Sequence, residues 1–240
     1  GEIQAAFDLG DLLPFTSFGF PADEEEEIIP FSDEEPEIVI QTPNDPVGSS
    51  SAVDSVNEAG LPVRGDGEAG EPAGTDEASD SESTSGTILL NATDGLASVT
   101  INGVEVSSVG QTISTPLGVL TITAFDLDAG VIQYAYTLAD NTLDASASDV
   151  FTIAAEDSDG DTATASLTIN IVDDAPIAAD DAASIEAGTF GPATGNVLDN
   201  DVSGADDFAA DGAISGVSAG DNTVGPGTAI QGEYGSLTLN

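Results

Sequence analysis

The chain has 240 residues, of which 45 are Asp or Glu and one is basic, so its formal net charge is −44. Such a polyanion is repelled by nucleic acid and by anionic membrane surfaces, and neither is expected as a partner. The chain also lacks Cys, His and Lys, which excludes disulfides, thiol or Schiff-base catalysis, a His-containing triad and a zinc site with nitrogen or sulfur ligands. No apolar run approaches the roughly 20 residues of a transmembrane helix. We therefore expect a protein that is not an enzyme and does not insert into a membrane.

Residues 1–51 are expected to form an acidic, mostly disordered linker. Acidic runs such as Asp23 to Glu27, together with frequent Pro, are typical of chains that cannot bury enough apolar surface to fold. The segment also holds an apolar patch at residues 7–20, FDLGDLLPFTSFGF, in which Gly and Pro break every period. We interpret the patch as part of a disordered leader, with docking on a neighbouring module as the alternative.

Residues 52–173 show short segments of alternating apolar and polar residues separated by turn residues, the pattern of antiparallel β-strands. Asp94-Gly95, Asn102-Gly103 and Asp159-Gly160 are dipeptides typical of hairpin turns. The pattern predicts an all-β fold, an antiparallel Ig-like or cadherin-like β-sandwich, interrupted by a long acidic loop at residues 65–85. The expected strands are Val53–Val56, Thr87–Asn91, Ala97–Ile101, Val104–Ser107, Gln111–Ile113, Val119–Phe125, Val131–Leu138, Val150–Ala155 and Ala163–Ile171.

A second module is expected after the sandwich. Residues 174–179 would be the interdomain linker, and residues 180–240 the truncated start of a second cadherin-like repeat ending on a strand near Ser236–Leu239. Glu58-Ala59-Gly60 recurs as Glu186-Ala187-Gly188, 128 residues later. This spacing suits tandem sandwich domains better than a solenoid, whose period is shorter.

An acidic turn between the last two expected strands of the sandwich is a candidate metal site. Asp157, Asp159 and Asp161 alternate with Ser158 and Gly160, and Ca²⁺ takes six to eight oxygen ligands of this kind. The turn is not an EF-hand loop, because its Gly stands at the fourth position and Thr168 at the twelfth. An ordinary Asp-Gly hairpin explains the residues equally well, so both interpretations stay open.

The acidic linker is a second candidate calcium site. Asp173 and Asp174 precede a Pro that stiffens the connection, and Glu186 with Asp199 and Asp201 of the following module could approach them. We favour Ca²⁺ here over a merely solvated linker, because the net charge requires counterions. Arg64-Gly65-Asp66 forms the tripeptide that some integrins read, although a Gly-rich acidic loop is the preferred interpretation.

The runs ASVTINGVEV, GQTISTPLGVLTIT, IQYAYTLADNT and DVFTIAAEDSDGDTATASLTINIVDDAP resemble the repeat of giant bacterial adhesins exported by type I secretion, the RTX type. The resemblance covers roughly Val53 to Pro176. DDAASIEAG, TGNVLDNDVSGAD and GEYGSLTLN resemble the start of a VCBS-type, cadherin-like repeat.

This resemblance implies an extracellular or cell-surface stalk of tandem Ig-like domains, rigidified by Ca²⁺ and serving adhesion and biofilm formation. Asp173, Asp174 and Glu186 would be linker ligands, and Asp157, Asp159 and Asp161 would serve the opposite end. The partners would be neighbouring repeats of the same chain and, through domains outside this segment, a host, abiotic or cell surface. The alternatives are a halophilic surface protein whose acidity binds no specific ion, and a carbohydrate- or receptor-binding module.

Overall fold

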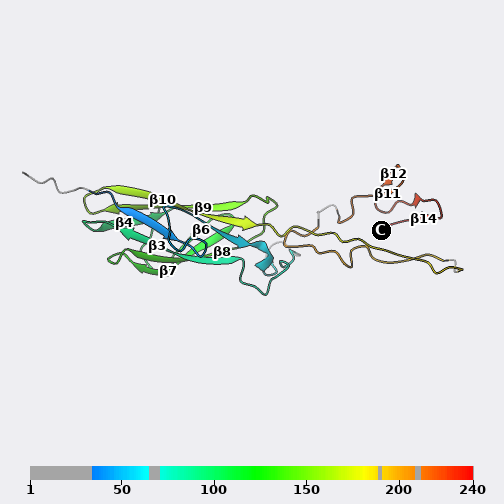
Figure 1. Ribbon diagram of the computed structural model, residues 1–240, viewed down its shortest axis with the longest axis horizontal. Coiled ribbons are helices and arrows are strands. Elements are labelled where there is room, and N and C mark those ends of the chain that lie inside the picture. The colour runs from blue at the N-terminus through cyan, green and yellow to red at the C-terminus, as the bar shows by residue number, and fades with distance from the viewer. Residues whose placement is uncertain (1–33, 65–70, 189–190, 209–211, 240) are drawn as a thin grey trace, which may run out of the picture. The chain divides into compact units, whose positions relative to one another are not determined.

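The computed structural model describes residues 34–64, 71–188, 191–208 and 212–239 (Figure 1). The apolar patch at residues 7–20, the acidic run before residue 28, and Gly65 and Asp66 lie outside the described residues.

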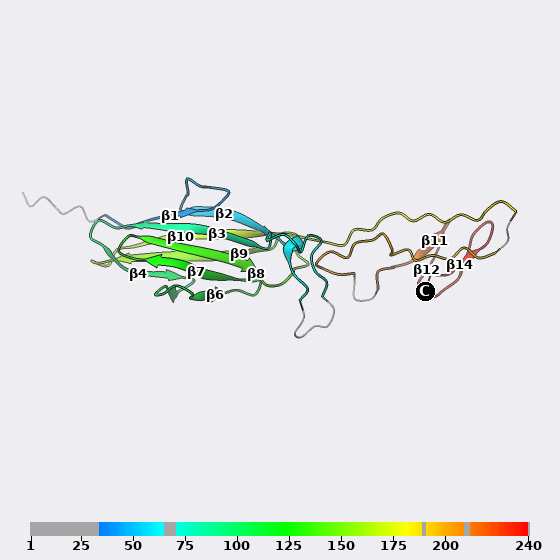
Figure 2. The same cartoon turned by 90° about the horizontal axis from the view of Figure 1, so that it is seen from below.

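Two five-stranded sheets form the folded part of the chain, with strand orders β1-β3-β8-β7-β6 and β2-β10-β9-β4-β5 (Figures 1 and 2). A single turn of 3-10 helix, η2 (Glu58–Gly60), follows β2. The strands are β1 (Glu37–Gln41), β2 (Ser51–Asn57), β3 (Ser83–Asn91), β4 (Leu96–Ile101), β5 (Val104–Glu105), β6 (Thr112–Ser114), β7 (Gly118–Asp126), β8 (Val131–Leu138), β9 (Ser148–Asp157) and β10 (Thr162–Val172).

The first two strands lie in different sheets. β1 pairs antiparallel with β3, whereas β2 crosses to the other sheet and pairs parallel with β10, the last strand of the sandwich. The remaining pairs within the two sheets are antiparallel. This confirms the predicted all-β, Ig-like sandwich. The pairing of β2 with β10 places an early strand of the sandwich beside its last strand.

The sandwich begins earlier than the sequence predicted. Residues 37–41 were expected in the linker, but they form β1 in register with β3, from Glu37 opposite Asn91 to Gln41 opposite Thr87. Ile38 and Ile40 are buried in the core. The prediction was wrong here because the short apolar run stands between acidic residues and Pro, so the composition around it was that of a linker.

The core lies between the two sheets and follows from strand alternation. Every second residue of β8 is buried, and the same holds for β9 and most of β10. The Tyr136 ring from one sheet meets the Phe151 ring from the other edge to face, with centroids 5.9 Å apart. The alternation expected for β7, β8, β9 and β10 is confirmed, because the following apolar residues within them are buried: Leu120, Ile122, Ile132, Tyr134, Tyr136, Leu138, Phe151, Ile153, Leu167, Ile169 and Ile171.

After β10 the described chain forms little regular structure. Ile177 and Val202 make an antiparallel bridge, followed by hairpins of β11 (Val217–Ala219) with β12 (Asn222–Val224) and of β13 (Ile230–Gln231) with β14 (Ser236–Leu237). The strand expected near residue 236 is therefore present, as β14. The assignment of residues 180–240 to a second repeat stays a prediction. In the described part of the chain, no helix has the length and apolar character needed to cross a bilayer.

Candidate metal sites at the two ends of the sandwich

Three carboxylates from distant parts of the sequence meet where β10 ends. Glu58, Asp173 and Asp206 each place one carboxylate oxygen within 4.8 Å of the others. Val172 pairs with Asn57 in the parallel register of β10 with β2, so the residues that follow these two, Asp173 and Glu58, are brought side by side. Asp206 is contributed by the segment that follows the linker. We call this group the exit cluster.

Glu58 is a fully buried carboxylate, with 0% of its surface exposed. Its Oε1 accepts the N–H of Thr142 at 2.7 Å and its Oε2 accepts the N–H of Asp174 at 3.2 Å. Burial raises the pKa of Glu58 to about 7; the two backbone N–H groups act to lower it, and the negative charges of Asp206 and Asp173 raise it further. The neighbouring groups therefore compensate the negative charge of Glu58 only in part.

Asp173 has a buried oxygen without a partner. Its Oδ1 makes no hydrogen bond to any described residue. Burial raises the pKa of Asp173, and so do the charge of Asp206 and the contact with its carboxyl group. Asp206 in turn accepts a hydrogen bond from Asn141 Nδ2 at 2.8 Å. A buried carboxylate oxygen that faces two other carboxylates is an arrangement that a bound cation would neutralise.

Asp174, the second linker aspartate, serves a different role from its neighbour. Its Oδ2 accepts the N–H of Thr75 at 2.8 Å and of Ala205 at 3.0 Å, and its Oδ1 accepts the Thr75 hydroxyl. Gly204 makes this approach possible, since its φ is +65° and a Cβ there would collide with the Asp174 carbonyl oxygen. Asp174 thus fixes the backbone that delivers Asp206 to the exit cluster.

Arg64, the one basic residue of the sequence, lies beside the exit cluster and is already engaged. Its Nε lies 3.0 Å from Glu71 and 3.2 Å from Asp140, and Nη2 donates to Asn141 at 2.9 Å and to the Ala205 carbonyl at 2.7 Å. Only 10% of the Arg64 side chain is exposed. An integrin would need this guanidinium in solution, so the geometry does not favour the receptor-binding interpretation of Arg64, whose neighbours Gly65 and Asp66 lie outside the described residues.

A second group of three carboxylates lies at the opposite end of β10. Asp94, Asp157 and Asp159 also place oxygens within 4.8 Å of one another, and the 11 residues of β10 span about 36 Å between this end and Asp173. Two turns meet here, because Leu96 pairs with Asp157 and the N–H of Ser158 donates to the Gly95 carbonyl at 2.9 Å. We call this group the turn cluster.

Asp157 is the buried member of the turn cluster, with 1% of its surface exposed. Its Oδ1 accepts the N–H groups of Gly160 at 3.1 Å and Asp161 at 2.8 Å. Its Oδ2 is buried and has no hydrogen-bond partner in the described structure. The DSDGD turn is therefore a hairpin stabilised by Asp157, and the same side chain keeps one buried oxygen without a hydrogen bond in a cluster with two other carboxylates.

The pKa values of Asp157 and Asp94, two members of the turn cluster, are shifted in opposite directions. Burial acts to raise the pKa of Asp157, but hydrogen bonding with Asp159 and with the backbone N–H groups of Asp161 and Gly160 outweighs it, so the pKa lies below its usual value. Asp94 shows the reverse: slight desolvation and the charges of Asp157 and Asp159 raise its pKa. Asp157 therefore stays ionised at neutral pH.

The remaining predicted ligands lie outside both clusters. Asp161 contributes its backbone N–H and carbonyl to Asp157, and Glu186 is exposed. Asp199 accepts a hydrogen bond from Asn196 at 2.5 Å, and Asp201 accepts the N–H of Ala179 at 2.7 Å. Three members of the clusters, Glu58, Asp94 and Asp206, were not predicted as ligands, although Glu58 lies in the repeated Glu-Ala-Gly tripeptide and Asp94 in a predicted Asp-Gly turn.

No protein-family model and no curated protein matches the sequence. Among solved structures, the N-terminal Ig1-2 module of the Drosophila receptor protein tyrosine phosphatase DLAR is similar to this chain, with a TM-score of 0.30 and 14% sequence identity. The similarity covers 61% of this chain and 57% of that chain, so the match spans little more than half of the DLAR module.

Proposed function

We propose that this chain is a non-catalytic spacer segment of a large extracellular or surface-bound bacterial adhesin, and that Ca²⁺ bound at the ends of its sandwich rigidifies the stalk for cell adhesion and biofilm formation. The exit cluster carries the proposal. Its members follow β2, follow the last strand β10, and lie in the segment after the linker, so one ion would tie these three parts of the chain together.

The exit cluster has the chemistry of a site for a hard cation. Two carboxylate oxygens within 4.8 Å of each other repel by at least about 3 kcal/mol at an effective dielectric constant of about 20. Arg64 forms its ion pairs with Glu71 and Asp140, which are not members of the cluster. Calcium binds oxygens at about 2.3–2.6 Å, so two ligands on opposite sides of the ion lie about 4.6–5.2 Å apart. The carboxylate oxygens of the exit cluster lie within 4.8 Å of one another, close enough to share one ion.

The turn cluster would hold a second ion at the other end, where a preceding repeat would join. The buried Oδ2 of Asp157, with Asp94 and Asp159, offers the same donor set. An ion at each end of each module would stiffen a chain of modules at every joint. The partners would then be neighbouring repeats of the same chain, with the adhesive contact made elsewhere in the protein.

Calcium would also couple secretion to folding. A ligand that binds only the folded state stabilises it by RT ln(1 + [L]/Kd), and extracellular calcium modules bind at about 10⁻⁴–10⁻³ M. Where calcium is scarce, the acidic chain would be destabilised by its own repulsion. Outside the cell, calcium would complete both clusters.

The test is thermal unfolding in CaCl₂ and in NaCl at the same ionic strength. The proposal predicts a clearly higher melting temperature in CaCl₂. A halophilic surface protein without specific ion sites would gain as much from NaCl, and equal melting temperatures would overturn the calcium proposal.

A further inference from the structure

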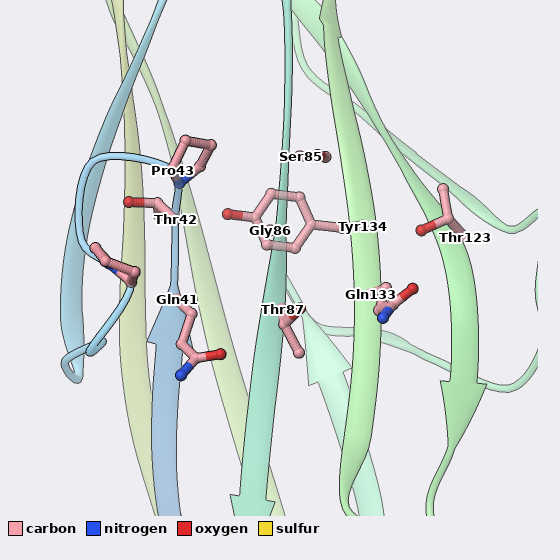
Figure 3. A pocket seen from close by; sticks show the side chains of 10 residues that line it. Gln41, Thr42, Pro43, Ser85, Gly86, Thr87, Thr123, Gln133 and Tyr134 are labelled. Atoms are coloured by element: carbon pink, nitrogen blue, oxygen red, sulfur yellow. The ribbon is translucent and has the colours of Figure 1, made fainter.

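A groove of about 410 Å³ lies over the sheet that contains β1, β3, β8 and β7, at the point where β1 ends and the chain turns away (Figure 3). Its polar lining consists of hydroxyl and amide groups, from Gln41, Thr42, Ser85, Thr87, Thr123 and Gln133. Thr87 lies opposite both Gln41 and Gln133 in the strand register, so three neighbouring strands present hydrogen-bonding groups together.

The lining of this groove contains no charged residue, although 45 of the 240 residues of the chain are acidic. An anionic ligand would find no cation there and would be repelled by the net charge. A cationic ligand would be drawn to the acidic turns instead. The groove therefore selects for a neutral ligand that can both donate and accept hydrogen bonds, as hydroxyl and amide groups do.

Tyr134 adds a buried group that lacks a partner. Its side chain is 0% exposed, and its hydroxyl makes no hydrogen bond in the described structure. Figure 3 shows the ring lying across β3 at Gly86, with the hydroxyl directed toward Thr42. A Cβ at Gly86 would collide with that hydroxyl and with the Gln41 carbonyl oxygen, so Gly86 makes room for the buried Tyr134 ring on the core face of the sheet, beneath the groove.

We propose that this groove binds a neutral carbohydrate of one or two sugar units. Its volume falls in the range of about 300–1,000 Å³ found for small-molecule sites. Gln41, Thr87 and Gln133 bind sugar hydroxyl groups, and the rings of Pro43 and Pro46 form an apolar wall against the C–H face of the sugar. The groove would give the spacer a weak adhesive contact of its own, independent of the cation sites.

The experiment is an NMR titration of the ¹⁵N-labelled full chain with D-glucose, D-galactose, D-mannose, N-acetylglucosamine, maltose and cellobiose, with D-glucuronate as the anionic comparison. At least one neutral sugar is expected to shift the amide signals of Gln41, Thr87 and Gln133 with a millimolar Kd. Glucuronate is expected to bind more weakly than D-glucose. Chelator and CaCl₂ should leave the Kd unchanged.

Two variants and their matched controls locate the site. Gln41→Ala and Gln133→Ala should each weaken binding about two- to tenfold, the loss of one neutral hydrogen bond. Tyr136→Phe removes a hydroxyl that donates to Asp149 at 2.7 Å, away from the groove, and Thr152→Ala alters an exposed residue of β9 in the other sheet; both should bind as the wild type does. The proposal is overturned if no neutral sugar in the panel shifts these signals, or if Gln41→Ala and Gln133→Ala bind as tightly as the controls.

Discussion

Asp173 lies beside Glu58 because the strands that precede them, β10 and β2, run parallel and in register, with Val172 opposite Asn57. One residue past this pair, the chain places two carboxylates within 4.8 Å of each other and adds a third, Asp206. The site at the exit of the sandwich is thus a consequence of how the Ig-like fold closes, and the joint to the following segment forms at the same place.

Replacing Asp173 by Asn should have opposite effects with and without calcium. In chelator, removing one of three crowded charges should stabilise the fold by about 1 kcal/mol, a figure reduced for the partial exposure of Asp173. In CaCl₂ the variant should lose most of the calcium-induced increase in melting temperature. Thermal unfolding in both buffers measures this, with Asp128→Asn in an exposed turn as the control. If both variants kept the full calcium effect, the exit cluster would not be the site.

The stability of the calcium-free protein should fall as the pH rises. The pKa of Glu58 is about 7 in the folded state, against an ordinary value of 4.5 for Glu, so the native state binds more protons than the unfolded state between pH 4.5 and pH 7. By linkage the free energy of unfolding decreases from pH 4.5 to pH 7, by on the order of 3 kcal/mol for this group, and levels off above pH 7.

Urea unfolding in chelator at pH 5 and pH 7.5 measures this dependence. Asp173, whose pKa is also raised, acts in the same direction. Glu58→Gln should flatten the profile, and calcium should flatten it in the wild type because the ion stabilises the charged form. An unchanged slope in Glu58→Gln would show that Glu58 does not titrate as its burial implies.

The turn cluster should account for a calcium ion of its own. Asp94 is exposed, and Asp94→Asn should change the free energy of unfolding in chelator by no more than about 0.5 kcal/mol. Isothermal titration calorimetry should nevertheless show one bound calcium fewer in Asp94→Asn than in the wild type, and one fewer again when Asp173→Asn is combined with it. A stoichiometry that Asp94→Asn leaves intact would rule out calcium at this end.

Arg64 should stabilise the connection after the linker. Replacing it by Gln removes the ion pairs of Arg64 with Glu71 and Asp140 and its hydrogen bond to the Ala205 carbonyl, at a cost of about 1–3 kcal/mol, between the values for exposed and buried pairs. Hydrogen exchange at the Ala205 amide, which donates to Asp174, should accelerate. Arg64→Lys keeps the positive charge but lacks the planar guanidinium, so the exchange rate of its Ala205 amide should lie between those of the wild type and of Arg64→Gln. Unchanged exchange in Arg64→Gln would contradict this role.

The strands were largely predictable because their alternation and turns are local features. Residues Val131–Leu138 were predicted as a strand and form β8 with the same bounds. The strand β1 could not be recognised, since its stability comes from pairing with β3, more than 40 residues away. Only the folded register shows that the apolar residues near Ile38 belong to the core.

The candidate sites were predictable only in part, for a related reason. Asp173, Asp157 and Asp159 were expected and lie in the clusters, but their companions depend on contacts between distant segments. The Glu-Ala-Gly repeat marked Glu58 and Glu186 alike, and the parallel pairing of β2 with β10 puts Glu58 at the exit. Asp94 joins Asp157 through the pairing of β4 with β9, which no local pattern reveals.

The most direct measurement is a high-resolution crystal structure of the chain grown in CaCl₂, with anomalous scattering to identify the ion. The account predicts one calcium bound by oxygens of Glu58, Asp173 and Asp206 at about 2.3–2.6 Å. An exit cluster that contains water alone at saturating calcium, with the three carboxylates turned away from one another, would contradict it.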